Sequence, residues 1–65
     1  MQLIFTLHAK QQMVVRGISK QQVIDAIKQG AKIRQTDGLL SSYGYIKVAY
    51  KIRGEKYIVK TVMIQ

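Results

Sequence analysis

The sequence holds one histidine, and its spacing from two other polar residues is the first feature that suggests chemistry. His8, Gln12 and Arg16 follow one another at intervals of four residues, which would place them along one side of a helix with a drift of about 40° per step. An imidazole can act as an acid or a base, and the free amides at the start of a helix favour an anion. The polar track therefore predicts contact with a phosphate, with His8 as the acid or base and Arg16 steadying the charge.

Each residue of this track also has an ordinary structural interpretation. A lone histidine at the start of a helix is commonly a solvated or locally hydrogen-bonded side chain. Arg16 is followed by Gly17, a residue type that ends helices, and an arginine at that position complements the negative end of the helix dipole. Both interpretations stay open at the level of the sequence.

The second chemical feature is positive charge, because eleven lysines and arginines stand against three acidic residues and give a net charge of +8. Such a field attracts phosphate backbones or anionic membranes without specifying a fold. Lysines recur along the C-terminal part of the chain with Tyr45, Ala49 and Ile58 between them, a combination that suits nucleotides. A solvated sheet face that lysines protect from aggregation is the alternative. The predicted nucleic-acid contacts are Gln12, Tyr45, Lys47, Lys51, Lys56 and Lys60.

The acids and thiols of the chain argue against several enzyme classes. There is no cysteine, and Asp25, Asp37 and Glu55 fall on an outer helix face and in two turns. Metal-dependent hydrolysis needs clustered carboxylates, histidines or thiolates, and glycosidases need a carboxylate pair. We therefore expect no metal and no cofactor. RNA remains an accessible substrate because its own 2′-hydroxyl attacks the neighbouring phosphate, so a base, an acid and cations are sufficient.

The first helix is expected to carry the polar track. Thr6 can accept a hydrogen bond from free amides, which places this helix at about Leu7 to Arg16, and Gly17 ends it. The apolar lead Met1 to Phe5 is compatible with either a strand or an extended arm.

The second helix has the clearest local signals. Ser19 and Gln22 form a capping-box pattern, and the helix runs to about Gln29, where Gly30 closes it. Its apolar residues gather in one stripe, as a surface helix packed on a core requires. The stripe consists of Val23, Ile24, Ala26 and Ile27.

From Ala31 the apolar residues recur with a period of two, which is typical of strands. Lys32 to Arg34 suggests one strand, Asp37-Gly38 a turn and Tyr43 to Ile52 a long strand. A turn at residues 53–55 and a last strand from about Lys56 to Ile64 complete a hairpin, for which we expect a connection of two or four residues.

That hairpin is expected to have one apolar face and one basic face, because side chains alternate along a strand. The predicted apolar face consists of Ile46, Val48, Tyr50, Ile52, Tyr57, Val59, Thr61 and Met63. The predicted basic face includes Lys47, Lys51, Lys56, Ile58, Lys60 and Val62.

Together these elements predict an α+β fold with two N-terminal helices packed on a three- to four-stranded antiparallel sheet, in the order α-α-β-β-β. The 65 residues would form a single domain. A chain of this size buries only roughly 60% of its unfolded surface, so a partner or a homodimer would supplement its stability. The longest apolar runs have three residues, so we expect no membrane-spanning helix, no signal peptide and no membrane contact. A cytoplasmic location fits these features and the absence of cysteine best.

The opening of the chain resembles a widespread bacterial and archaeal family of domains of unknown function. The residues that carry the resemblance are His8-Ala9, Met13, Arg16-Gly17-Ile18-Ser19 and Val23, and the closing stretch from Ile58 to Val62 is similar to the terminal strand of that family. The family looks like part of the compact RelE/BrnT group of ribonuclease toxins, whose fold is RelE/barnase-like.

The resemblance implies a metal-independent endoribonuclease of toxin–antitoxin type, neutralised by a protein antitoxin. It assigns catalytic roles to His8, Arg16 and Thr61, although Lys60 splits the usual spacing between valine and threonine. The residue before Met13 is normally arginine in the family pattern and is Gln12 here, so a non-catalytic RNA-binding relative is the other form of this prediction.

Two further classes of function stay open. Two short helices followed by a β-hairpin are compatible with a winged-helix DNA-binding protein, in which Gln21, Gln22 and Lys28 would face DNA. The absence of a third helix, and a basic charge that lies mostly outside the second helix, count against it. A protein-interaction module with an acidic partner is the remaining alternative.

Overall fold

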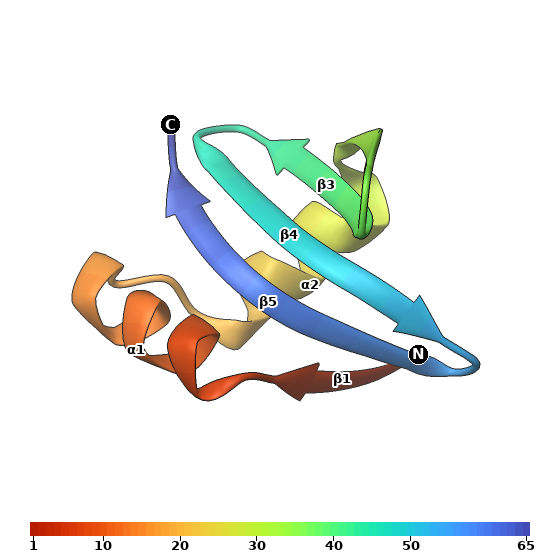
Figure 1. The fold of residues 1–65 in the computed structure, drawn as a ribbon. Coiled ribbons are helices and arrows are strands. Elements are labelled where there is room, and N and C mark those ends of the chain that lie inside the picture. Colours follow the sequence, from red (N-terminus) through yellow and green to blue (C-terminus); the bar gives the residue numbers. More distant parts are fainter.

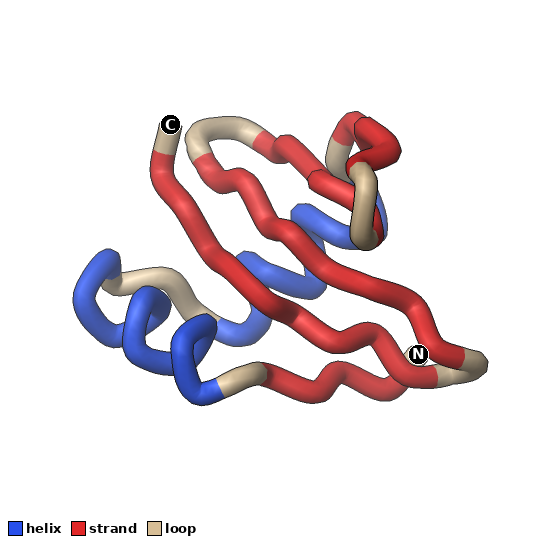
Figure 2. Tube along the Cα trace, viewed as in Figure 1, coloured by secondary structure: helices blue, strands red, loops and turns tan.

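The computed structural model describes all residues from 1 to 65 and contains two helices and one five-stranded sheet (Figures 1 and 2). Neither α-helix has the length and apolar character that a membrane-spanning helix requires. The elements in chain order are β1 (Gln2–Phe5), α1 (Leu7–Arg16), α2 (Lys20–Gln29), β2 (Ala31–Gln35), β3 (Gly38–Tyr43), β4 (Ile46–Arg53) and β5 (Lys56–Ile64).

Both helices begin and end where the local capping signals predict. The Thr6 side chain accepts a hydrogen bond from the Ala9 amide at 3.1 Å, and Gly17 ends α1 with a left-handed φ of 65°. Ser19 and Gln22 form the complete capping box at the start of α2. The predicted bounds are confirmed because caps depend only on residues close in sequence.

The predicted fold class is wrong in the place of the first strand, in the kind of sheet and in the number of strands, which is five rather than three or four. The order is β-α-α-β-β-β-β rather than two N-terminal helices followed by strands. Spatially the sheet runs β1-β5-β4-β3-β2, and β1 pairs in parallel with β5 through residues such as Leu3 and Tyr57, so the sheet is mixed. The short apolar lead finds its partner at the other end of the chain, which no local pattern can indicate.

One face of the sheet carries both helices. Val48 and Tyr50 of β4, Val59 of β5, Ala9 of α1 and Val23 of α2 are almost wholly excluded from solvent and belong to one cluster. In Figure 1, α2 lies behind the sheet, where it packs on β3 and β4, and α1 lies beside β5. The buried Ser41 hydroxyl of β3 donates to the backbone carbonyl of Ala26, which ties α2 to the sheet. The opposite face of β4 and β5 carries no helix.

A β-bulge in β5 changes which of its residues reach the core. Tyr50 pairs with Val59, but Ala49 pairs with Thr61, so Lys60 is an extra residue in β5. The extra residue exchanges the faces of the remaining strand. The predicted placement of Thr61 and Met63 on the apolar face and of Val62 on the basic face is therefore wrong.

The structure shows the opposite arrangement after the bulge. Val62 pairs with Val48 and is fully buried, while Met63 pairs with Lys47 on the helix-free face. Before the bulge the prediction is confirmed, because Tyr57 pairs with Ile52 through the expected two-residue connection.

The middle of the chain forms a β2–β3 hairpin that leads into β4. The predicted strand from Tyr43 to Ile52 is instead divided by a turn at Gly44 and Tyr45, so β4 begins at Ile46. Asp37 lies in the turn before β3, as predicted. Gly38 has a φ of 125° and approaches the backbone carbonyl of Tyr50 so closely that a side chain would not fit there.

Candidate nucleic-acid interface

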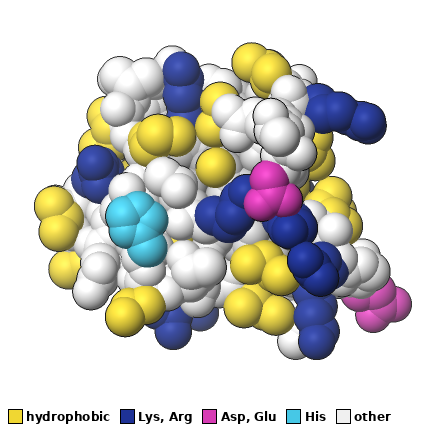
Figure 3. Space-filling model, viewed as in Figure 1, with side chains coloured by type: hydrophobic (Ala, Val, Ile, Leu, Met, Phe, Trp, Pro, Cys, Tyr) yellow, Lys and Arg dark blue, Asp and Glu magenta, His cyan; other side chains and the backbone are white.

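The helix-free face of the sheet combines lysines with apolar side chains. The register places Lys47 and Lys51 of β4 on the same side as Lys56 and Lys60 of β5, as predicted, because Lys51 lies opposite Ile58. Figure 3 views this side of the molecule and shows lysine and arginine side chains gathered around apolar ones. On β1, β4 and β5 the residues of this face include Ile4, Lys47, Ala49, Lys51, Arg53, Lys56, Ile58, Lys60, Thr61 and Met63.

We call this surface the basic face. Its lysines in the middle of the strands are half-buried, and Ile58 and Met63 are also half-buried. Long lysine stems pack along apolar neighbours while their ammonium groups stay in water. The arrangement offers positive charge for a phosphate backbone and apolar surface for bases on one side of the sheet.

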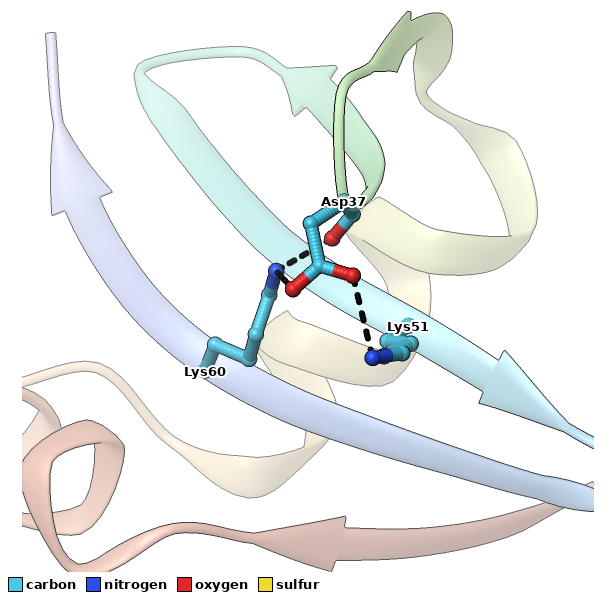
Figure 4. A network of polar contacts seen from close by, with 3 residues as sticks. All are labelled: Asp37, Lys51 and Lys60. Atoms are coloured by element: carbon cyan, nitrogen blue, oxygen red, sulfur yellow. Dashed lines mark hydrogen bonds and ion pairs between the residues drawn. The ribbon is translucent and has the colours of Figure 1, made fainter.

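Asp37 reaches onto the basic face from the β2–β3 turn and contacts two of its lysines (Figure 4). One carboxylate oxygen lies 3.0 Å from Lys51 Nζ and the other lies 3.5 Å from Lys60 Nζ. Lys60 Nζ also donates to the Asp37 backbone carbonyl. The hydrogen bond and charge of Lys51, followed by the charge of Lys60, hold the pKa of Asp37 below its ordinary value. These are the only ion pairs of the chain, so the positive charges of Lys47 and Lys56 have no acidic partner.

α1 is fixed to the part of β5 that β1 does not cover. The Thr6 hydroxyl donates to the Lys60 carbonyl at 3.3 Å, and Gln12 Oε1 accepts a hydrogen bond from the Val62 amide at 2.8 Å. His8 lies one helical turn before Gln12 and is exposed. The histidine side chain, cyan in Figure 3, is visible from the same side as the basic face. The docking of α1 therefore places His8 two residues after Thr6, whose hydroxyl contacts the Lys60 carbonyl, on the side of the molecule that carries the basic face.

The other two members of the polar track have different surroundings. Gln12 is half-buried, and its side-chain oxygen is used by the backbone of β5. Arg16 is exposed at the end of α1, about 12 Å along the helix axis from His8 at the usual rise per residue. The three residues of the track therefore do not form one cluster, because Gln12 is bonded to β5 and Arg16 lies about two turns of helix beyond His8.

Tyr45 lies away from the lysines with which the sequence grouped it. It belongs to the β3–β4 turn, is 58% exposed, and its hydroxyl lies 3.4 Å from Gln22 Nε2 of α2. The prediction that Tyr45 shares a face with the lysines is wrong, because β4 starts only after it.

Sequence reasoning missed two parts of the interface. The sequence places Asp37 in a turn, but no residue near it in the chain indicates that this turn folds toward Lys51 and Lys60. The bulge left a signal in the sequence, because Val59 and Val62 are three residues apart in a strand whose other core residues alternate. No group of three or more histidine, cysteine or acidic side chains comes together in the fold.

Comparison with known proteins gives a family and no described relative. A family model described as a domain of unknown function (DUF4258) matches residues 5–64. No curated protein and no solved structure matches the chain.

Proposed function

Because the chain belongs to the DUF4258 family, whose function is unknown, we propose from its own surface that it binds single-stranded RNA across the basic face. The observation that carries the proposal is the composition of the helix-free side of β4 and β5. Lys47, Lys51, Lys56 and Lys60 lie there around Ile58 and Met63 on one exposed sheet surface.

A single strand fits this surface better than a duplex. Its bases are free to turn toward the sheet and contact apolar side chains, while its phosphates follow the lysines. The face extends along two neighbouring strands without an inserted helix that could enter a major groove. We therefore expect binding with little sequence preference and a strong dependence on salt.

Cleavage of the bound RNA is the second candidate function, and the position of His8 favours it. In a metal-independent reaction a base removes the proton of a 2′-hydroxyl, the oxygen attacks the adjacent phosphorus, and the 5′-oxygen leaves with a proton from an acid. The products are a 2′,3′-cyclic phosphate and a 5′-hydroxyl end. We propose that His8 supplies one of the two proton transfers, that a lysine of the basic face stabilises the phosphate charge, and that the Thr61 hydroxyl contacts the phosphate.

The chain opening resembles a family that looks like part of the RelE/BrnT group of toxins, and this likeness supports the second candidate. A protein antitoxin and a cytoplasmic location belong to the same proposal. Gln12 replaces the arginine of the family pattern, and its oxygen is occupied by the Val62 amide. A lysine of the basic face would therefore have to provide the cation that the pattern places on α1.

The test of binding compares equal charge changes on and off the basic face. We expect Lys47→Gln combined with Lys56→Gln to weaken binding of a labelled single-stranded RNA by about tenfold or more at 0.15 M salt, and to reduce the salt slope by about 0.7 per lost phosphate contact. The matched control, Lys28→Gln with Lys32→Gln, removes the same charge from α2 and β2. Equal losses in both double variants would show that only the net charge matters and would refute the proposed face.

The test of cleavage uses the same RNA and the matching DNA in excess EDTA. We expect RNA alone to be cut, and His8→Ala to abolish cutting while RNA affinity changes less than about twofold, because one exposed imidazole adds little to binding by several lysines. An uncut RNA that still binds would leave RNA binding as the function and remove the catalytic role of His8.

A further inference from the structure

The carboxylate of Asp37 is an anion that the chain itself places between two lysines of the basic face. We propose that Lys51 and Lys60 form a binding site for a terminal phosphate group, and that Asp37 occupies this site in the free domain. The proposal deepens the proposed RNA-binding function and rests on it, because it names the part of an RNA that this site selects.

The Asp37 carboxylate lies between the two ammonium groups in the way that a bound phosphate would. Each carboxylate oxygen of Asp37 faces a different ammonium group, at 3.0 Å from Lys51 and 3.5 Å from Lys60, as Figure 4 shows. A phosphate presents two or three non-bridging oxygens that can join two ammonium groups in the same way. The distance between the lysines is therefore already suited to an oxyanion.

The site is open to a ligand. The Asp37 side chain is 67% exposed, and those of Lys51 and Lys60 are 31% and 34% exposed, so water reaches all three. The lysines stand on neighbouring strands in the middle of the sheet, whereas Asp37 belongs to a turn. Rotation of the Asp37 side chain removes its carboxylate from the site, while Lys60 Nζ still donates to the Asp37 backbone carbonyl and keeps two of its three donors for a ligand.

The charge of the ligand decides whether it replaces Asp37. An internal phosphodiester carries one negative charge, so its entry exchanges one monoanion for another and gains little. A terminal phosphate carries a charge of about −1.5 to −2 at pH 7 and has three strong acceptor oxygens. The site therefore selects RNA ends that bear a phosphate over hydroxyl ends and internal linkages.

The experiment measures the affinity of one short RNA sequence prepared with a 5′-phosphate, a 3′-phosphate or hydroxyl groups at both ends. We expect the parent protein to prefer at least one phosphorylated form by about fivefold or more, since the terminal group carries up to one more charge than a diester. Lys51→Gln with Lys60→Gln should abolish this preference. Lys47→Gln with Lys56→Gln removes the same charge from the same face and should weaken all three RNAs while keeping the preference.

A second pair of variants tests the role of Asp37. Asp37→Asn frees the two lysines, and Glu55→Gln removes the same charge from the β4–β5 turn, where no ion pair is formed. We expect Asp37→Asn to tighten binding of the phosphorylated RNA by about fivefold and Glu55→Gln by less than about twofold, because the latter changes only the overall field. Equal effects of the two variants, or equal affinity of the parent protein for all three RNAs, would overturn the proposed site.

Titration with inorganic phosphate separates failure of the site from failure of the function. Phosphate should shift the NMR signals of the Lys51 and Lys60 side chains before those of Lys47 and Lys56. Those shifts without any binding of RNA would support the site and refute the RNA-binding function. RNA binding of equal affinity for all three end groups would support the RNA-binding function and refute the site.

Discussion

The two faces of the sheet are built by the same strands and have opposite properties. On β4, Val48 is wholly buried under the helices, and its neighbour Lys47 is half-exposed on the basic face. The helix-covered face excludes water from tightly packed side chains, whereas the basic face keeps its polar groups solvated. The difference teaches that the fold depends on one face and leaves the other free for binding, since the lysines can change without opening the core.

The largest expected effect is a difference in stability between substitutions at two adjacent residues of β4, one on each face. Tyr50 is 1% exposed and stacks on Tyr57 with ring centroids 5.9 Å apart. We expect Tyr50→Ala to lower the free energy of unfolding by about 3–5 kcal/mol, as large-to-small changes of buried aromatic residues do. Urea denaturation followed by circular dichroism measures this loss. The neighbouring Lys51→Ala should cost less than about 1 kcal/mol because its ion pair is exposed. A cost of Lys51→Ala close to that of Tyr50→Ala would show that the basic face also supports the fold.

An intermediate effect on stability is expected for the hydrogen bond that joins α1 to β5 just after the bulge. Gln12 accepts the Val62 amide hydrogen at the bulge, and arginine has no acceptor atom in its side chain. Gln12→Arg should therefore lower the free energy of unfolding by about 1–3 kcal/mol through an unpaired, partly buried amide. Faster hydrogen exchange of the Val62 amide would locate the loss.

The neighbouring Gln11 provides the control for that change. Gln11 is exposed on the same helix, so Gln11→Arg adds an equal charge and should stay within about 0.5 kcal/mol of the parent protein. If both variants unfold at the same urea concentration, the hydrogen bond between Gln12 and the Val62 amide contributes nothing to the free energy of unfolding.

The smallest expected effect concerns the acidity of Asp37 on the basic face. Its pKa is lowered from an ordinary value of 3.8 by Lys51 and Lys60, so the folded state binds this proton less readily than the unfolded state. The ion pairs thus contribute stability above about pH 4, and this contribution disappears as the pH falls through the lowered pKa. The difference in stability between the parent protein and Asp37→Asn should shrink on acidification. A difference that stays constant from pH 7 to pH 2.5 would contradict the ion pairs, and Glu55→Gln serves as the comparison without them.

The elements set by neighbouring residues could be predicted from the sequence. Thr6 and Ser19 begin the helices with hydrogen bonds that reach three residues, and the alternation from Ile46 to Ile52 gave the correct faces of β4. The lysines of the basic face followed from that alternation. Local signals are sufficient where the partner is close in the chain.

The features set by distant partners could not be predicted in the same way. β1 has four residues and becomes a strand because β5 offers it a parallel edge. The bulge at Lys60 reversed the predicted places of Thr61 and Val62, because one extra residue exchanges the faces of everything after it. The contacts of Thr6 with Lys60 and of Gln12 with Val62 depend on how α1 lies against β5, which the helix pattern does not contain.

The position of β5 has a consequence for the speed and order of folding. It is the last strand in the chain and lies between β1 and β4, and Thr6 of the first loop is 54 residues from its partner Lys60. A contact of that span has a high cost of chain closure, so its formation is slow compared with helices and local hairpins. The β2–β3–β4–β5 meander and α2 can form first from nearby partners. We therefore expect attachment of β1 and α1 to be the late step, so the hydrogen bonds of Thr6 with Lys60 and of Gln12 with Val62 exist only in chains that have completed it.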